Sequence, residues 1–106
     1  MLVSTTNDVP GHRTIKHLGL VRGITVRSRS VVGNLAGGIQ SLFGGKLTVY
    51  VSLAETARQE AYDHLCEHAQ AAGANAVIAM RYDANEIMDG ITEVLAYGTA
   101  VVVEAA

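Results

Sequence analysis

The segment from residue 91 to residue 104 constrains the fold most strongly, because it is apolar on both faces when it is extended. Successive side chains of a β-strand point to opposite faces of the sheet, so each face needs its own cover. One side carries Ile91, Leu95, Tyr97, Val101 and Val103, and the other carries Val94, Ala96, Ala100 and Val102. The pattern predicts a strand that is buried on both faces.

The remaining predicted elements place the chain in the α+β class. Its 106 residues have the length of one domain, residues 1–106, and contain no internal repeat. Patterning predicts a short strand over 1–6, a strand over 14–27, a helix over 31–43, a long helix ending at 72, and a strand over 74–82. Residues 83–90 are rich in carboxylate and amide side chains and predict a solvated hairpin loop.

The long helix has the clearest pattern in the chain. Leucine and alanine recur at helical spacing, at positions 53, 57, 61, 65, 69 and 72. Gly73 follows where a left-handed C-cap belongs. The start of the helix has two interpretations, because Ser52 and Glu55 form a capping box whereas Leu47–Val51 alternates as a strand does.

The predicted elements are too few to bury everything that is apolar. One long and one short helix cannot cover both faces of a four-stranded sheet. We therefore expect the even face of the last strand, at positions 94, 96, 100 and 102, to be buried by another subunit. The chain has no tryptophan and one phenylalanine, so an isolated subunit would have a core of small side chains and marginal stability.

Charge is divided between the two halves of the chain. Residues 1–54 carry six cationic side chains and one acid, for a net charge of +5, and residues 55–106 carry two cationic side chains and nine acids, for −7. A head-to-tail ring would set a basic edge against an acidic edge at each junction. Nucleic-acid binding is the less favoured alternative, because no aromatic residue lies among the basic positions to stack on bases.

The N-terminal residues 1–8 lack the basic and apolar regions of a secretory signal, and no apolar run has the length of a membrane span. Cys66 is the single cysteine, so no internal disulfide can form. We expect a soluble cytoplasmic protein.

Several short motifs resemble the YbjQ-like family of small uncharacterised proteins, which carries the label "putative heavy-metal-binding". They are Gly44-Gly45, Tyr50, Ala57-Arg58, Gly73-Ala-Asn-Ala-Val77 and Tyr82-Asp83, with Ser4-Thr5-Thr6 and His17–Gly23 near the start. The likeness covers nearly the whole chain, which would then be a single YbjQ-like domain.

The resemblance implies a two-layer α/β subunit with an antiparallel sheet, similar to the dodecin subunit, that assembles as a ring-like homopentamer. It also implies a helix that begins near Lys46, so we prefer that interpretation over a strand at Leu47–Val51. This sequence departs from the family pattern at Val51, where an acidic residue is usual, and at Ala79, where a glycine is usual.

His64 and His68 are the best metal candidates, because residues four apart share one helix face and can chelate one ion. Cys66 points about 200° away from His64 on a helix of 3.6 residues per turn, so the three residues cannot bind one ion within a subunit. A packed, hydrogen-bonded His68 is the alternative that we favour. Any cofactor is unknown from the residues, a divalent metal ion being the one that they suggest.

Tyr50, Arg58 and Asp83 belong to the family pattern and are the candidate ligand-binding residues. A salt bridge between helix and strand is the simpler interpretation, and a polar pocket at a subunit junction is the other. We therefore expect a non-catalytic homo-oligomeric binding or scaffold protein that takes a metal or a small ligand at subunit junctions. The alternative is an enzyme whose interfacial active site uses these three residues.

Overall fold

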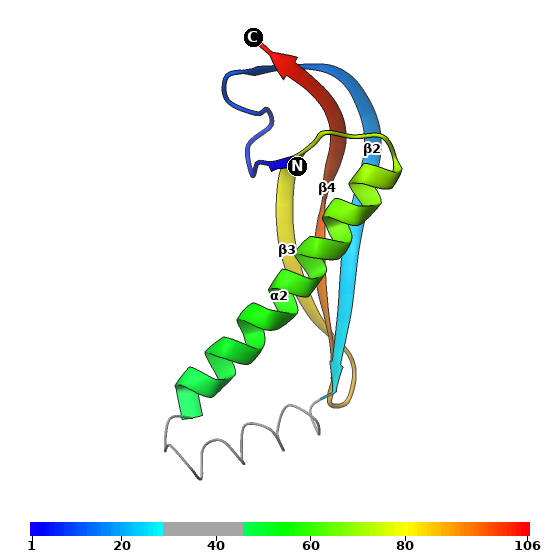
Figure 1. Cartoon of the computed structure of the whole chain (residues 1–106). Helices are drawn as coiled ribbons and strands as arrows, with labels where there is room; N and C mark the ends of the chain where they lie inside the picture. Colours follow the sequence, from blue (N-terminus) through cyan, green and yellow to red (C-terminus); the bar gives the residue numbers. More distant parts are fainter. Residues whose placement is uncertain (29–45) are drawn as a thin grey trace.

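The computed structural model describes residues 1–28 and 46–106, so the helix predicted over 31–43 lies outside the described residues. The elements are β1 (Leu2–Val3), β2 (His12–Ser28), α2 (Lys46–Ala71), β3 (Ala76–Met88) and β4 (Ile91–Ala105). The strands form one sheet in the order β1-β3-β4-β2, and α2 crosses one face of it (Figure 1). Within the described ranges, no helix is both long and apolar enough to cross a membrane.

β4 is a central strand of the sheet, and both of its faces are apolar because each is covered over part of its length. It pairs with β2 from Ser28↔Ile91 to His12↔Ala105 and with β3 on its other side. Its even residues Ala96 and Ala100 are fully buried in the core beneath α2. Its odd residues Val101 and Val103 are buried on the opposite face, where Val9 of the segment after β1 covers them.

Two expectations about the sheet are wrong. The even face of β4 is not left for another subunit, because α2 packs against Ala96 and Ala100. The sheet is mixed rather than antiparallel, because β1 pairs in parallel with β3 at Leu2↔Ala76. A two-residue edge strand carries too little periodic signal for its direction to be predicted from sequence.

The carboxylate-rich segment after residue 82 is a strand and not a loop. β3 continues to Met88 because it stays paired with β4, for example at Asp83↔Leu95 and Glu86↔Thr92. The turn is confined to Asp89 and Gly90, and Gly90 has a φ of 78°. A tight hairpin with glycine in the left-handed region needs no longer connection.

The long helix begins at Lys46, as the family resemblance implied, and the alternative strand at Leu47–Val51 does not form. It ends at Ala71 and is followed by Gly73, whose φ of 92° is that of a left-handed cap. Ala61, Leu65 and Ala69 are fully buried against the sheet. The helical periodicity of these residues therefore reports a real packing stripe.

Gly23 allows α2 to approach β2 closely. A Cβ atom at this position would lie 2.0 Å from the Ala61 carbonyl oxygen and 2.3 Å from the Leu65 backbone nitrogen. Both neighbours are backbone atoms of α2, so they cannot move without displacing the helix. The small residues on the helix stripe and Gly23 together set the distance between the two layers.

Ala79 occupies a position with left-handed backbone geometry, at φ 53°. It lies within a register irregularity between Ile78 and Arg81, where its N–H turns to donate to the Thr6 carbonyl at 2.8 Å. Glycine, which the family resemblance leads us to expect here, adopts this conformation without a Cβ clash. The departure from the pattern thus places local strain in β3.

We expect Gly23→Ala to destabilise the fold by at least about 2 kcal/mol, because the added methyl group overlaps helix backbone. Urea denaturation followed by circular dichroism measures this loss. Arg22→Ala, on the same strand and exposed, should change the free energy of unfolding by less than about 0.5 kcal/mol. An equally mild effect of Gly23→Ala would mean that the two layers are not in such close contact.

We expect Ala79→Gly to stabilise the fold by up to about 1 kcal/mol. Glycine removes the backbone strain of the left-handed position, and this gain outweighs the conformational entropy that glycine adds to the unfolded chain. The same denaturation experiment checks the sign. Ala84→Gly, in a regular part of the same strand, is the matched control and should destabilise. A loss of stability in Ala79→Gly as large as in the control would contradict the strain.

Candidate functional site

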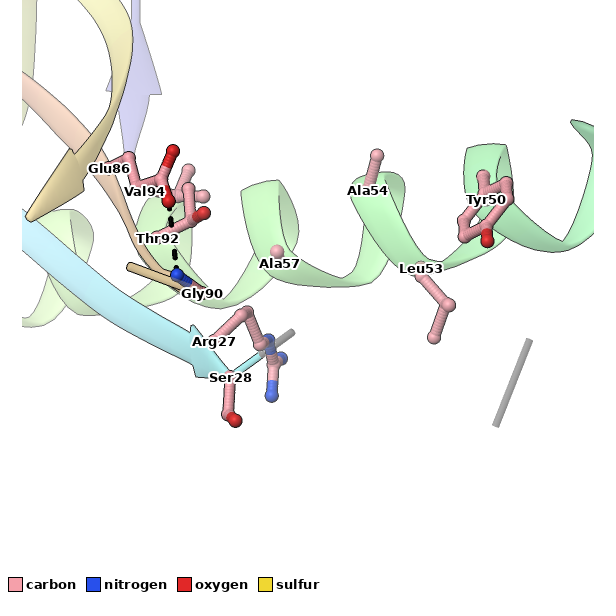
Figure 2. A pocket seen from close by; sticks show the side chains of 10 residues that line it. All are labelled: Arg27, Ser28, Tyr50, Leu53, Ala54, Ala57, Glu86, Gly90, Thr92 and Val94. Carbon is pink, nitrogen blue, oxygen red and sulfur yellow. Dashed lines mark hydrogen bonds between the residues drawn. The ribbon is translucent and has the colours of Figure 1, made fainter. Parts of the chain in front are cut away.

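A hollow lies between the first half of α2 and the end of the β3–β4 hairpin (Figure 2). Its volume is about 360 Å³. Four residues come from α2 and the others from the three long strands and the hairpin turn. They are Tyr50, Leu53, Ala54 and Ala57, with Arg27, Ser28, Glu86, Gly90, Thr92 and Val94.

The sheet register brings three polar side chains of this hollow into one row. Thr92 pairs with Glu86 of β3 on one side and with Arg27 of β2 on the other. Directly opposed residues of neighbouring strands project to the same face. Glu86, Thr92 and Arg27 therefore stand side by side on the face toward α2, with Val94 two residues further along β4.

Arg27 lines the hollow, but its ion pair is with a residue of α2. Its guanidinium contacts the Glu60 carboxylate at 2.5 Å, and the Thr25 hydroxyl donates to the same carboxylate at 3.0 Å. These two hydrogen bonds, that of Arg27 first, lower the pKa of Glu60. The cationic charge of Arg27 is thus already matched by an ionised partner.

Glu86 is less fully engaged. Its Oε1 atom accepts a hydrogen bond from the Gly90 N–H at 3.0 Å, which ties the side chain to the hairpin turn (Figure 2). No cation among residues 1–28 and 46–106 forms an ion pair with it. The Thr92 hydroxyl, opposite Glu86, has no hydrogen-bond partner within the same described ranges.

Arg58 and Asp83 line a second, smaller hollow of about 160 Å³ together with Tyr82. Arg58 stacks over the Tyr82 ring, with its guanidinium carbon 5.8 Å from the ring centre. Asp83 instead accepts the backbone N–H of Ala84 at 2.9 Å, and no ion pair links it to Arg58 in the described structure. Burial raises the pKa of Tyr82, which keeps its hydroxyl protonated.

Tyr50 does not join Arg58 and Asp83, because it lines the larger hollow. Tyr50 and Arg58 are eight residues apart on α2, which separates them by about 12 Å along the helix axis. The three candidate ligand-binding residues are therefore distributed over two hollows within one subunit.

The histidines and the cysteine of α2 have separate environments. His68 accepts the backbone N–H of Arg22 through Nδ1 at 3.1 Å, so it packs against the edge of β2. His64 is exposed, with its Nδ1 atom 3.8 Å from the Glu67 carboxylate. Burial raises the pKa of the half-buried Cys66, which disfavours the thiolate that a metal would need.

The hollow of Figure 2 was not predicted from sequence. Arg27, Glu86 and Thr92 come from three separate strands, and only the register aligns them. The interpretation of residues 83–90 as a loop concealed Glu86. Had the strand been extended to residue 88, the Asp89-Gly90 turn would have placed Glu86 near residue 92.

The family described as "Putative heavy-metal-binding" (YbjQ) matches residues 1–104 of this chain. The chain belongs to the YbjQ family. A UPF0145 protein of Chromobacterium violaceum is 63% identical over 103 residues, covering 97% of this chain and 88% of the relative. A UPF0145 protein of Paraburkholderia phymatum is 60% identical over 100 residues, covering 94% and 90%.

The fold is also similar to a crystal structure from Pediococcus pentosaceus, described as a protein of unknown function in the DUF74 family. The TM-score is 0.64, and the match covers 98% of each chain at 14% sequence identity. This likeness concerns the fold alone.

The residues of this YbjQ subunit do not fit a heavy-metal ion by themselves. No group of three or more histidine, cysteine, aspartate or glutamate side chains converges within residues 1–28 and 46–106. His64 and His68 supply two nitrogen ligands at most, whereas zinc sites normally use three or four protein ligands. The described part of one subunit therefore contains no complete set of ligands for the heavy metal that the family description names.

We expect any micromolar binding of zinc or copper(II) at neutral pH to survive His68→Ala, because the histidine pair lacks further ligands within one subunit. Titration calorimetry measures this, with His68→Ala as the variant and His12→Ala as the control. If the native protein binds metal in the micromolar range, and His68→Ala abolishes this binding while His12→Ala preserves it, the expectation is wrong and His68 belongs to a metal site.

Proposed function

We propose that the protein is a non-catalytic, homo-oligomeric scaffold or binding protein, and that its sheet face opposite α2 is a subunit contact. The observation that carries this proposal is the apolar character of that face. Leu20, Ile24 and Val26 of β2 are 67%, 43% and 52% exposed on it. An apolar surface of this kind on a small domain is typical of a protein interaction site.

The open face is defined by the alternation of β2. Val21 and Gly23 face α2, so Leu20 and Ile24 face away from it. Leu20 also lines a depression of about 250 Å³, together with Arg22, Asp83, Leu95 and Tyr97. Among residues 1–28 and 46–106, the segment after β1 covers the other end of this face, around Val101 and Val103.

Charge supports a head-to-tail arrangement of copies. Exposed Lys16 and Arg22 lie on β2 at one edge of the sheet, and exposed Asp83 lies on β3 toward the other. Like edges would repel across a two-fold axis, whereas a cyclic arrangement brings opposite charges together at each junction. The dodecin-like ring form and the number five come from the family resemblance alone.

The enzyme alternative, with a site made of Tyr50, Arg58 and Asp83, has weaker support. These residues line two hollows, and stacking on Tyr82 already engages Arg58. A metal or small ligand held at subunit junctions remains part of the proposal, because each open edge could supply ligands to its neighbour. We place the assembly in the cytoplasm, where a protein with one cysteine needs no oxidising compartment.

We expect the native protein to form a stable oligomer in multi-angle light scattering, and Leu20→Lys to dissociate it, since a charge would be buried in the contact. Gln70→Lys adds the same charge to an exposed position of α2 and should leave the mass unchanged. Circular dichroism would distinguish dissociation from unfolding. A folded native monomer at micromolar concentration would refute the assembly.

A further inference from the structure

We propose that the hollow between α2 and the β3–β4 hairpin binds a small molecule with a primary ammonium group on an apolar body. This site lies within one subunit and goes beyond the proposed scaffold function. Its evidence is the composition of the walls and the arrangement of charge across the sheet (Figure 2).

The apolar body would lie along the helix wall. Leu53, Ala54 and Ala57 line it from α2, and Val94 faces them from β4. Tyr50 to Ala57 spans about 10 Å along the helix axis, which is enough for an aromatic ring and a short linker. A volume of about 360 Å³ is within the range of small-molecule sites, which are usually apolar with a few polar groups.

The ammonium group would lie at the strand end of the hollow. Glu86 and Thr92 are directly paired across β3 and β4, so a carboxylate and a hydroxyl oxygen stand next to each other. The hydrogen bond from Gly90 engages Oε1 of Glu86, which leaves its Oε2 atom for a ligand. A primary ammonium has three donors and can use both residues.

The charges at the hollow favour a cation over an anion. Arg27 is the only cationic side chain among the lining residues that the structure describes, and it forms an ion pair with Glu60. Arg27 and Glu86 stand on either side of Thr92, separated by two strand spacings or about 10 Å, so Arg27 does not neutralise Glu86 directly. The negative charge of Glu86 is therefore available to a ligand.

Phenethylamine is a suitable probe, because it joins an aromatic ring to a primary ammonium. We expect it to bind the native protein in the millimolar range and to shift the backbone amide signals of residues 53–57 and 90–94. Its neutral counterpart 2-phenylethanol should bind more weakly by up to about fivefold, the largest difference expected from one ion pair at an exposed carboxylate.

Glu86→Gln should weaken the binding of phenethylamine by up to about fivefold and leave that of 2-phenylethanol unchanged, since only the charge is removed. Thr92→Val, which keeps the shape of the side chain, should weaken phenethylamine by a smaller factor. Glu93→Gln is the matched control, because Glu93 is on the same strand but points to the other face. It should bind phenethylamine as the native protein does.

Three results would overturn the site. One is the absence of amide shifts at the lining residues with phenethylamine at ten millimolar or more, a range that covers weak fragment binding. Another is equal binding of phenethylamine and 2-phenylethanol. The third is an equal effect of Glu86→Gln and Glu93→Gln. All of these are measured on the assembled or monomeric protein alike, so failure of the oligomer proposal would not obscure them.

Discussion

The contact between α2 and β2 at Gly23 determines how the two layers of the subunit are arranged. The glycine lets helix backbone approach to a distance that any side chain would prevent. On α2, Ala61, Leu65 and Ala69 recur every four residues and are fully buried against the sheet. Small side chains bury little apolar area per residue. The stability of this core therefore depends on close packing between the helix and the sheet.

This single close contact has consequences at both ends of the helix. Figure 1 shows α2 crossing the sheet obliquely, so its first half extends past the strands while its second half lies over them. His68 reaches the backbone of Arg22 at the closely packed end. Where the helix leaves the sheet, the layers separate and the hollow of Figure 2 opens between α2 and the hairpin. The candidate ligand site is thus a result of the packing angle.

The described residues cover the opposite face of the sheet only in part. The segment after β1 buries Val101 and Val103 through Val9, but it does not extend over Leu20 and Ile24. Within the part of the chain that the structure describes, the sheet therefore has one face covered by a helix and one face that is covered at one end. Apolar strand residues that are exposed in a single subunit favour contact with a second copy of the chain. The separation of charge along the chain favours a head-to-tail contact.

The sequence by itself determined the elements with strong local periodicity: the helix that ends before Gly73, the strand around residues 14–27 and the apolar last strand. The family pattern located the helix start at Lys46, which local patterning left open. The tertiary structure alone decided which face of β4 the helix covers, because either face is apolar enough. It also decided the parallel pairing of β1, the extension of β3 through a polar segment, and the row of Glu86, Thr92 and Arg27. Those features depend on strand register and on contacts between residues far apart in the chain, and a local pattern contains neither.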